Sequence, residues 1–355
     1  MKINDWFFKL QKVPITAKIF LLQNLAIMIK TGIPLTEGLR TLGEQTKNKK
    51  LKLILNDLGE KIRQGKNFGE GLAEYQRDFG ELFVNMVKAG EVSGQLEKVL
   101  KELYGQTKKD HEIKTKVRNA LIYPTIIVVA MIGIGLFVLF FVLPNIISML
   151  SDLQVQLPLA TRILIGISNV AQKHGILLVA ALLVLLAAAV KIGRTKKGKY
   201  FLDAFFLKLP VVSPIIQKIN LARMARSLSS LIKTDIDIVN TLDITSRVLG
   251  NSLYRRALSE SIDKVKKGQK LESIFRAYPK LFPPVIIQMI AVGEETGALD
   301  EILENLAGFY EEEISETMDT LPTIIEPILM ILIAIGVAGV ALAVMMPIYS
   351  LTQNF

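Results

Sequence analysis

The sequence contains no cysteine and only two histidines, His111 and His174, which stand in unrelated contexts. The absence of cysteine excludes disulfide bonds, thiol catalysis and cysteine metal sites, and it leaves the redox compartment undetermined. No cluster of His, Asp and Glu has metal-ligand spacing. We also expect no signal peptide, because no basic start precedes an apolar run with a small-residue cleavage site. These absences argue against an enzyme that uses a metal, a thiol or a bound cofactor.

One segment imitates a nucleotide site. Residues 193–199, Gly-Arg-Thr-Lys-Lys-Gly-Lys, match the first seven positions of a phosphate-binding P-loop. Tyr200 then occupies the position that needs Ser or Thr for the magnesium ion, and no strand precedes the segment. Its basic residues are better interpreted as a cytoplasmic anchor beside a membrane helix. We therefore expect no enzymatic activity, no cofactor and no nucleic-acid partner.

Charge is absent from three long apolar runs, Asn119–Ser151, His174–Val190 and Pro327–Phe355. Each run is near or above the ~18–20 residues that a helix needs to cross a bilayer. Buried core helices are the alternative, which the length of the first run disfavours. The sequence therefore predicts three transmembrane helices and a lipid bilayer as the surrounding medium.

A duplication organises the rest of the chain. Residues 90–97, Gly-Glu-Val-Ser-Gly-Gln-Leu-Glu, recur as residues 293–300, Gly-Glu-Glu-Thr-Gly-Ala-Leu-Asp, at an offset of 203 (293 − 90). The same ungapped offset pairs Lys30 with Lys233 and Pro124 with Pro327, so a whole domain has been copied. Two homologous domains that each lead into a span should face the same side, and a return span must lie between them.

Basic residues follow the second apolar run in quick succession, which places this part of the chain in the cytoplasm. We therefore expect a multi-pass membrane protein with a cytoplasmic N-terminus and an extracytoplasmic C-terminus. The expected organisation is an N-terminal segment at 1–16, a first cytoplasmic domain at 17–122, a transmembrane helix at 123–147, an extracytoplasmic loop at 148–172, a second transmembrane helix at 173–192, a second cytoplasmic domain at 193–322, a third transmembrane helix at 323–349 and an extracytoplasmic tail at 350–355.

Apolar residues recur at helical spacing, and no segment alternates with the period of a strand. The predicted fold class is an all-α membrane protein with two duplicated six-helix cytoplasmic bundles and three transmembrane helices. The helices are expected at 18–30, 35–45, 50–64, 68–75, 81–89 and from Gly94 onward, and again at 219–233, 238–248, 252–267, 271–278, 285–292 and 298–320. Asp235 and Asp237 replace Gly32 and Pro34 in the second copy, so we expect its first turn to be shaped differently.

The repeated motif predicts a tight reversal between two helices. Its glycines would supply a positive φ or a close approach, and Ser93 or Thr296 would cap the following helix. A carboxylate at Glu91 or Glu294 could bond free amides of the neighbouring turn or face a partner, whereas catalysis is disfavoured. The candidate residues are Gly90, Glu91, Gly94 and Leu96 in the first copy and Gly293, Glu294, Gly297 and Leu299 in the second.

Opposite charges occupy the same helix in the two copies. At the offset of 203, Lys108 and Lys109 align with Glu311 and Glu312, and Lys116 aligns with Asp319. Three readings remain open, namely a solvated face, attraction between the copies, and contact of the basic helix with an anionic membrane surface.

These features resemble the bacterial type II secretion F protein family. The most specific residues are Lys30-Thr31-Gly32-Ile33-Pro34-Leu35, residues 88–96 and their copies. The resemblance implies a non-enzymatic inner-membrane platform of a type IV pilus or type II secretion machine. Its implied partners are a cytoplasmic hexameric ATPase, pilin or pseudopilin subunits, other inner-membrane assembly proteins, and further copies of the chain in a homodimer or small oligomer. The alternative is a small-solute transporter or channel, which the scarcity of charge in the spans disfavours.

Overall fold

A computed structural model describes residues 12–142, 195–210 and 212–352, with isolated positions between 144 and 193. Helices form the regular structure of these residues, and no strand occurs among them. The fold is therefore all-helical, as predicted. Most of the predicted extracytoplasmic loop and much of the predicted second membrane helix lie outside the described residues.

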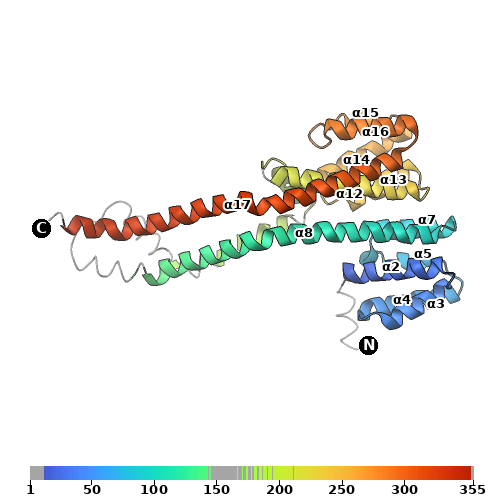
Figure 1. Cartoon of the computed structure of the whole chain (residues 1–355), viewed down its shortest axis with the longest axis horizontal. Helices are drawn as coiled ribbons and strands as arrows, with labels where there is room; N and C mark the ends of the chain where they lie inside the picture. Colours follow the sequence, from blue (N-terminus) through green and yellow to red (C-terminus); the bar gives the residue numbers. More distant parts are fainter. Residues whose placement is uncertain are drawn as a thin grey trace. The chain divides into compact units, whose positions relative to one another are not determined.

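The helices of the two copies follow one another in the same order (Figure 1). The short helix α6 has no counterpart in the prediction, and α12 begins at Val212 rather than at Ile219. The first copy leads into α8 (Leu96–Phe137) and comprises α2 (Ile15–Lys30), α3 (Leu35–Gln45), α4 (Lys49–Arg63), α5 (Phe68–Ala73), α6 (Gln76–Phe79) and α7 (Glu81–Val92). Helix α11 (Lys196–Phe206) precedes the second copy. The second copy leads into α17 (Leu299–Thr352) and comprises α12 (Val212–Lys233), α13 (Ile238–Val248), α14 (Ser252–Lys266), α15 (Leu271–Phe275) and α16 (Pro284–Thr296).

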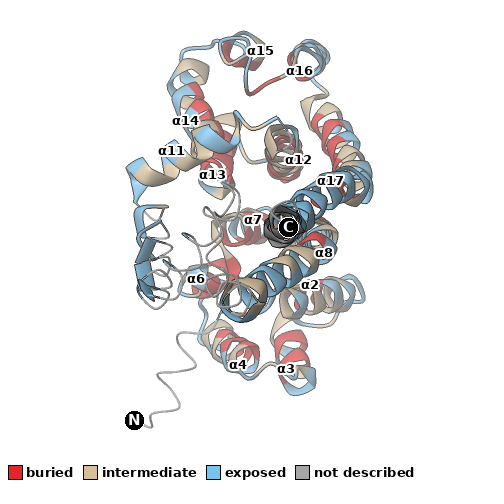
Figure 2. Cartoon of the chain, turned by 90° about the vertical axis from the view of Figure 1, so that its left-hand side faces the viewer, coloured by how far each residue is buried: buried red, intermediate tan, exposed pale blue. Residues whose placement is uncertain are grey.

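Local side chains explain several helix starts. The side chain of Asn48 accepts a hydrogen bond from the Leu51 amide at 2.8 Å at the start of α4, and Asn251 accepts one from Leu253 at 2.9 Å at the start of α14. These caps satisfy amides that have no partner inside the helix. Apolar positions three or four residues apart then turn one face of each helix inward, and the buried residues of α3 and α4 lie on such faces (Figure 2).

The turn between α12 and α13 has the same shape as the turn between α2 and α3, so the prediction of a different shape was wrong. Asp235 adopts a φ of 60°, close to the 82° of Gly32. The amide of Ile236 donates to Leu231 O just as that of Ile33 donates to Met28 O. Asp is one of the few side chains that tolerate this left-handed conformation, because it is short and polar.

The chain divides into two compact units, one formed by residues 1–115 and 200–315 and the other by residues 116–199 and 316–355. The first unit therefore contains the helical domains of both copies. Leu231 and Ile244 of the second copy belong to the same buried apolar cluster as the core leucines of the first. An ion pair of 2.7 Å between Arg247 of α13 and Glu81 of α7 joins the copies at the surface. The two domains thus fold against each other.

Among the described residues, two helices are long and apolar enough to cross a membrane, Leu96–Val142 and Leu299–Leu342. The first consists of α8 and a short π-helical turn, Val138–Val142, and it contains Pro124. The apolar C-terminal part of this helix exposes side chains such as Ile126, Val129 and Ile132. A helix needs about 20 apolar residues to span the hydrocarbon core, so both helices suffice.

Candidate functional site

The repeated motif forms the junction between α7 and α8 and between α16 and α17. Gly94 and Gly297 have left-handed backbones, with φ of 69° and 72°, a conformation that glycine adopts without a steric penalty. The amide of Gln95 donates to Gly90 O at 2.8 Å and closes the end of α7. The next helices then begin at Leu96 and Leu299.

Gly90 and Gly293 lie inside helices rather than in the turn. The predicted helix end at Ala89 was wrong, because α7 continues to Val92. Both glycines are buried, and their role is close approach. A Cβ atom at Gly90 would lie 2.5 Å from Val99 Cγ2, and one at Gly293 would lie 3.1 Å from Leu299 Cα. The missing side chains let the following helix fold back against the preceding one.

Thr296 does not cap the helix that follows it, contrary to the prediction. It is the last residue of α16, where its hydroxyl donates to Val292 O at 2.8 Å. A threonine at a helical position can reach the carbonyl four residues earlier, which explains the difference. Ser93 terminates α7 with its own amide, which donates to Ala89 O at 2.9 Å.

The carboxylate of Glu91 binds two backbone amides at the start of α5. Its two oxygens accept hydrogen bonds from Phe68 N at 2.6 Å and from Gly69 N at 2.7 Å. Such short, charge-assisted bonds are among the stronger ones in proteins. They also place a negative charge at the N-terminus of a helix, where the backbone dipoles favour it.

Glu294 makes the same pair of bonds in the second copy. It accepts from Leu271 N at 2.7 Å and from Glu272 N at 3.0 Å, at the start of α15. Each glutamate thus ties the turn that precedes a long helix to a short helix more than twenty residues earlier. This geometry corresponds to the first of the two roles considered from the sequence, a bond to free amides.

The structure brings only part of the predicted charge pairs together. Lys109 Nζ lies 3.9 Å from Glu311 Oε2, which joins α8 of the first copy to α17 of the second. Glu311 is held more closely by Arg226 of its own copy, at 3.0 and 2.9 Å. Lys108 lies over the ring of Tyr104 instead. Glu312 is exposed, and Lys116 and Asp319 belong to the second compact unit.

The copies are joined mainly by residues that the charge comparison did not select. Arg223 of α12 pairs with Asp110 of α8 at 2.8 Å, and Gln106 Nε2 donates to the hydroxyl of Ser227 at 3.0 Å. The offset of 203 aligns Arg223 with Phe20, so the arginine is specific to the second copy. This difference between the copies is the sequence signal that could have identified it.

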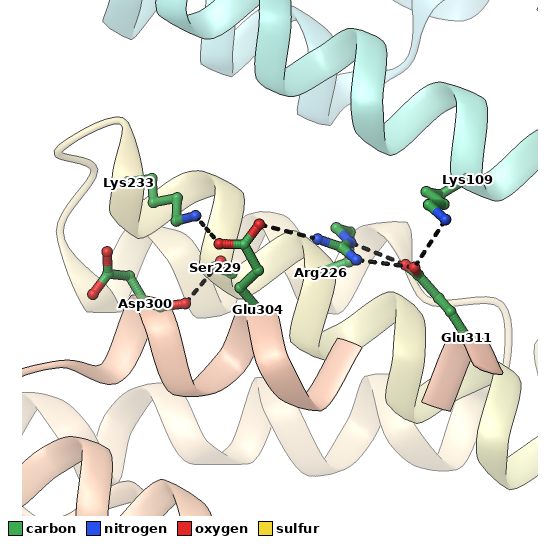
Figure 3. Close-up of polar contacts among 7 residues, drawn as sticks. All are labelled: Lys109, Arg226, Ser229, Lys233, Asp300, Glu304 and Glu311. Carbon is green, nitrogen blue, oxygen red and sulfur yellow. Dashed lines mark hydrogen bonds and ion pairs between the residues drawn. The ribbon is translucent and has the colours of Figure 1, made fainter. Parts of the chain in front are cut away.

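A chain of polar contacts closes α12 against α17 in the second copy (Figure 3). Arg226 binds Glu311 and also lies 3.7 Å from Glu304, which pairs with Lys233. Burial alone would lower the pKa of Lys233, but its hydrogen bond to Glu304 and the nearby negative charges of Glu304, Glu102 and Asp300 together outweigh burial and raise it. The hydroxyl of Ser229 donates to Asp300 O at 2.9 Å.

The corresponding face of the first copy is open. Five residues that align with members of this chain of contacts, together with Ile27 and Tyr104, line a groove of about 280 Å³ between α2 and α8. Lys30 aligns with Lys233, and Lys101 aligns with Glu304. Two lysines therefore stand where the second copy has the Lys233–Glu304 ion pair. No ion pair of Lys30 or Lys101 occurs within the described residues. The aligned lining residues are Gln23, Ala26, Lys30, Glu97 and Lys101. We call this the first-copy groove.

Residues 196–199 of the segment that imitates a P-loop form the start of α11. Thr195 accepts a hydrogen bond from Gly198 N at 3.1 Å, which caps α11. A Cβ at Gly198 would lie 2.1 Å from Ile192 O, so this glycine serves local packing.

The described residues define a class of protein, namely a duplicated helical protein in which each copy leads into a helix of membrane length. Two segments, residues 21–144 and 224–347, match the sequence model of the family described as type II secretion system (T2SS), protein F. The second segment begins and ends 203 residues after the first (224 − 21 and 347 − 144). The chain belongs to the type II secretion system protein F family.

Its relatives include proteins of both pilus assembly and secretion. The type IV pilus assembly protein PilC of Thermus thermophilus is 33% identical over 329 residues, which cover 93% of this chain and 81% of the relative. The PilC protein of Myxococcus xanthus is 32% identical over 326 residues, covering 92% and 78%. The type II secretion system protein F of Aeromonas hydrophila is 30% identical over 335 residues, covering 93% and 85%.

Proposed function

We propose that the chain is a non-enzymatic inner-membrane platform that couples a cytoplasmic hexameric ATPase to the insertion of pilin or pseudopilin subunits. The match of both copies to the secretion F family carries this proposal. The relatives named for pilus assembly and for secretion favour the same class of machine. A small-solute transporter or channel is the less supported alternative. Such proteins usually carry ionisable residues at membrane depth, whereas Glu326 is the one acidic residue near the apolar part of α17.

The architecture suits a platform. Each long helix begins at a paired turn in the first compact unit and continues without a break into its apolar part. The glutamates fix each turn to a neighbouring helix. A displacement of the cytoplasmic domain would therefore reach the membrane helix through continuous backbone.

We place the contact with the ATPase at the first-copy groove. The equivalent face of the second copy is closed by its own ion pairs, in which Arg226 and Lys233 are already bound to Glu311 and Glu304. Lys30 and Lys101 border the open groove and fit an acidic surface of a partner.

The expected result is that Lys30→Glu with Lys101→Glu lowers recovery of the ATPase by about fivefold or more, because two attractive contacts of ~0.2–1 kcal/mol each become repulsive. The measurement is co-purification of the ATPase with the full chain in detergent. Lys49→Glu with Lys52→Glu on α4 makes the same charge change at exposed positions and should have little effect. Equal losses of ATPase recovery from both pairs of substitutions would exclude the groove as the contact site. No recovery with the unaltered chain would contradict the platform, and solute uptake into proteoliposomes would then test the alternative.

The proposed topology has the N-terminus and residues 193–322 in the cytoplasm and the C-terminus outside, with three crossings. It is supported by the basic residues around 191–199 and by the duplication. Reporter fusions at Gln156 and after Phe355 should behave as extracytoplasmic. A cytoplasmic signal at Gln156 would overturn the three-span arrangement.

A further inference from the structure

A cavity of about 600 Å³ lies between the two copies, within the first compact unit. Its walls come from α2, α7 and α8 of the first copy and from α12, α13 and α17 of the second. Small-molecule sites commonly measure roughly 300–1,000 Å³, so the cavity can hold a ligand. It shares no lining residue with the paired turns or with the first-copy groove.

The acidic side chains of the lining are already paired with arginines. The lining also contains Lys12 and Lys18, and neither forms an ion pair within the described residues. The cavity therefore has positive charge that these carboxylates do not neutralise. The pairs are Glu81 with Arg247 at 2.7 Å, Asp110 with Arg223 at 2.8 Å and Glu311 with Arg226 at 2.9 Å.

Two buried polar atoms of the lining have no partner in the described chain. Arg223 donates through Nη2 to Asp110, while its Nε lacks an acceptor. Gln106 donates through Nε2 to Ser227, while its Oε1 lacks a donor. Buried groups of this kind are rare, and each calls for a ligand or an ordered water. A half-turn of the Gln106 amide would put an N–H donor where the unpartnered oxygen lies.

Lys18 lies in surroundings that compensate its charge only in part. Its Nζ is 5.8 Å from the centre of the Phe79 ring, a contact that favours the charged form. Burial lowers the pKa of Lys18, Asp78 opposes this, and Lys12 and Lys114 lower it further. A bound anion would compensate both the burial and the repulsion between the lysines.

From these contacts we propose that the cavity binds a small polyanion with two or more phosphate groups, held by Lys12, Lys18 and Arg223. The free Nε of an arginine, beside a second donor nitrogen, fits phosphate oxygens. A single carboxylate would leave part of the positive charge unmatched. Because both lysines belong to the first copy and Arg223 to the second, the ligand would bridge the copies. The phosphates can come from a soluble molecule or from a lipid headgroup.

The test is equilibrium dialysis of the full chain with radiolabelled inorganic pyrophosphate at a fixed salt concentration. The expected result is saturable binding of one pyrophosphate per chain. Lys18→Met and Lys12→Gln should each weaken it about tenfold, the effect of losing one good charged contact. Lys18→Met removes a poorly solvated charge, and Lys12 is exposed, so both variants should unfold thermally like the unaltered chain. Lys52→Met, at an exposed position on α4, is the matched control.

Two arms separate the sources of phosphate. The chain is dialysed in nanodiscs of phosphatidylcholine and in nanodiscs that contain cardiolipin, an anionic lipid with two phosphates. Binding in both indicates a soluble ligand, whereas loss only with cardiolipin indicates an anionic headgroup in the cavity, and either outcome supports a phosphate site. Absence of saturable binding in phosphatidylcholine would show that water alone satisfies the buried atoms, and it would overturn the proposal. Equal weakening by Lys52→Met, or equal affinity for sulfate, would also overturn it.

Discussion

Gly90→Val is expected to lower the free energy of unfolding of the first compact unit by about 2–3 kcal/mol, the upper range for overpacking a core. The new Cβ would lie 2.5 Å from Val99 Cγ2 and 2.9 Å from Val99 Cβ. Val99 is fully buried, and its branched side chain is stiff, so it cannot turn aside. Gly293→Val should destabilise the unit less, because its Cβ would meet the nearest atom, Leu299 Cα, at 3.1 Å.

Thermal unfolding of the full chain in detergent measures this effect. Gly105→Ala and Gly308→Ala are matched controls, since they are equivalent positions of α8 and α17 with no atom within 4 Å of an added Cβ. Alanine stabilises a helix interior relative to glycine by about 0.5–1 kcal/mol, so the controls should unfold slightly later. Unchanged unfolding of Gly90→Val would contradict the close packing of α7 and α8.

Glu91→Ala is expected to destabilise the first compact unit by about 2–4 kcal/mol. The substitution leaves the amides of Phe68 and Gly69 without their acceptor, and a hydrogen bond to a charged group contributes about 1.5–3 kcal/mol. Hydrogen–deuterium exchange should show faster exchange of these amides at the start of α5. Glu294→Ala should act in the same way on the start of α15.

Glu97→Ala is the control for the loss of a negative charge. Glu97 is exposed in the first turn of α8. Its loss should therefore lower the free energy of unfolding by less than about 1 kcal/mol. The role of Glu91 in assembly can be separated from its role in folding. If Glu91→Ala blocked pilus assembly or secretion without altering exchange in α5, a partner contact would replace the structural explanation.

The duplication made much of the fold accessible from the sequence. α3 and α13 have the predicted bounds, because Pro34 or Asp237 precedes each start and each has a strong apolar face. The turn at Asp235 was judged from residue type alone. Its shape depends on backbone hydrogen bonds that both copies form, and the residue types alone do not predict these bonds.

The contacts between the copies were less accessible. The comparison of like positions in two helices identified Lys109 and Glu311, but it could not show that Arg226 holds Glu311 more tightly. Arg223 and Asp110 meet only because the two domains fold into one unit. Such pairs join different positions of the repeat, and no fixed offset can find them.

The contact between the copies has a consequence for the history of the gene. Arg223, which joins the halves through Asp110, stands where the first half has Phe20. A chain recombined from two first halves would therefore lack the arginine that meets Asp110. The halves are complementary parts rather than interchangeable ones, so we expect substitutions at their boundary to arise in compensating pairs.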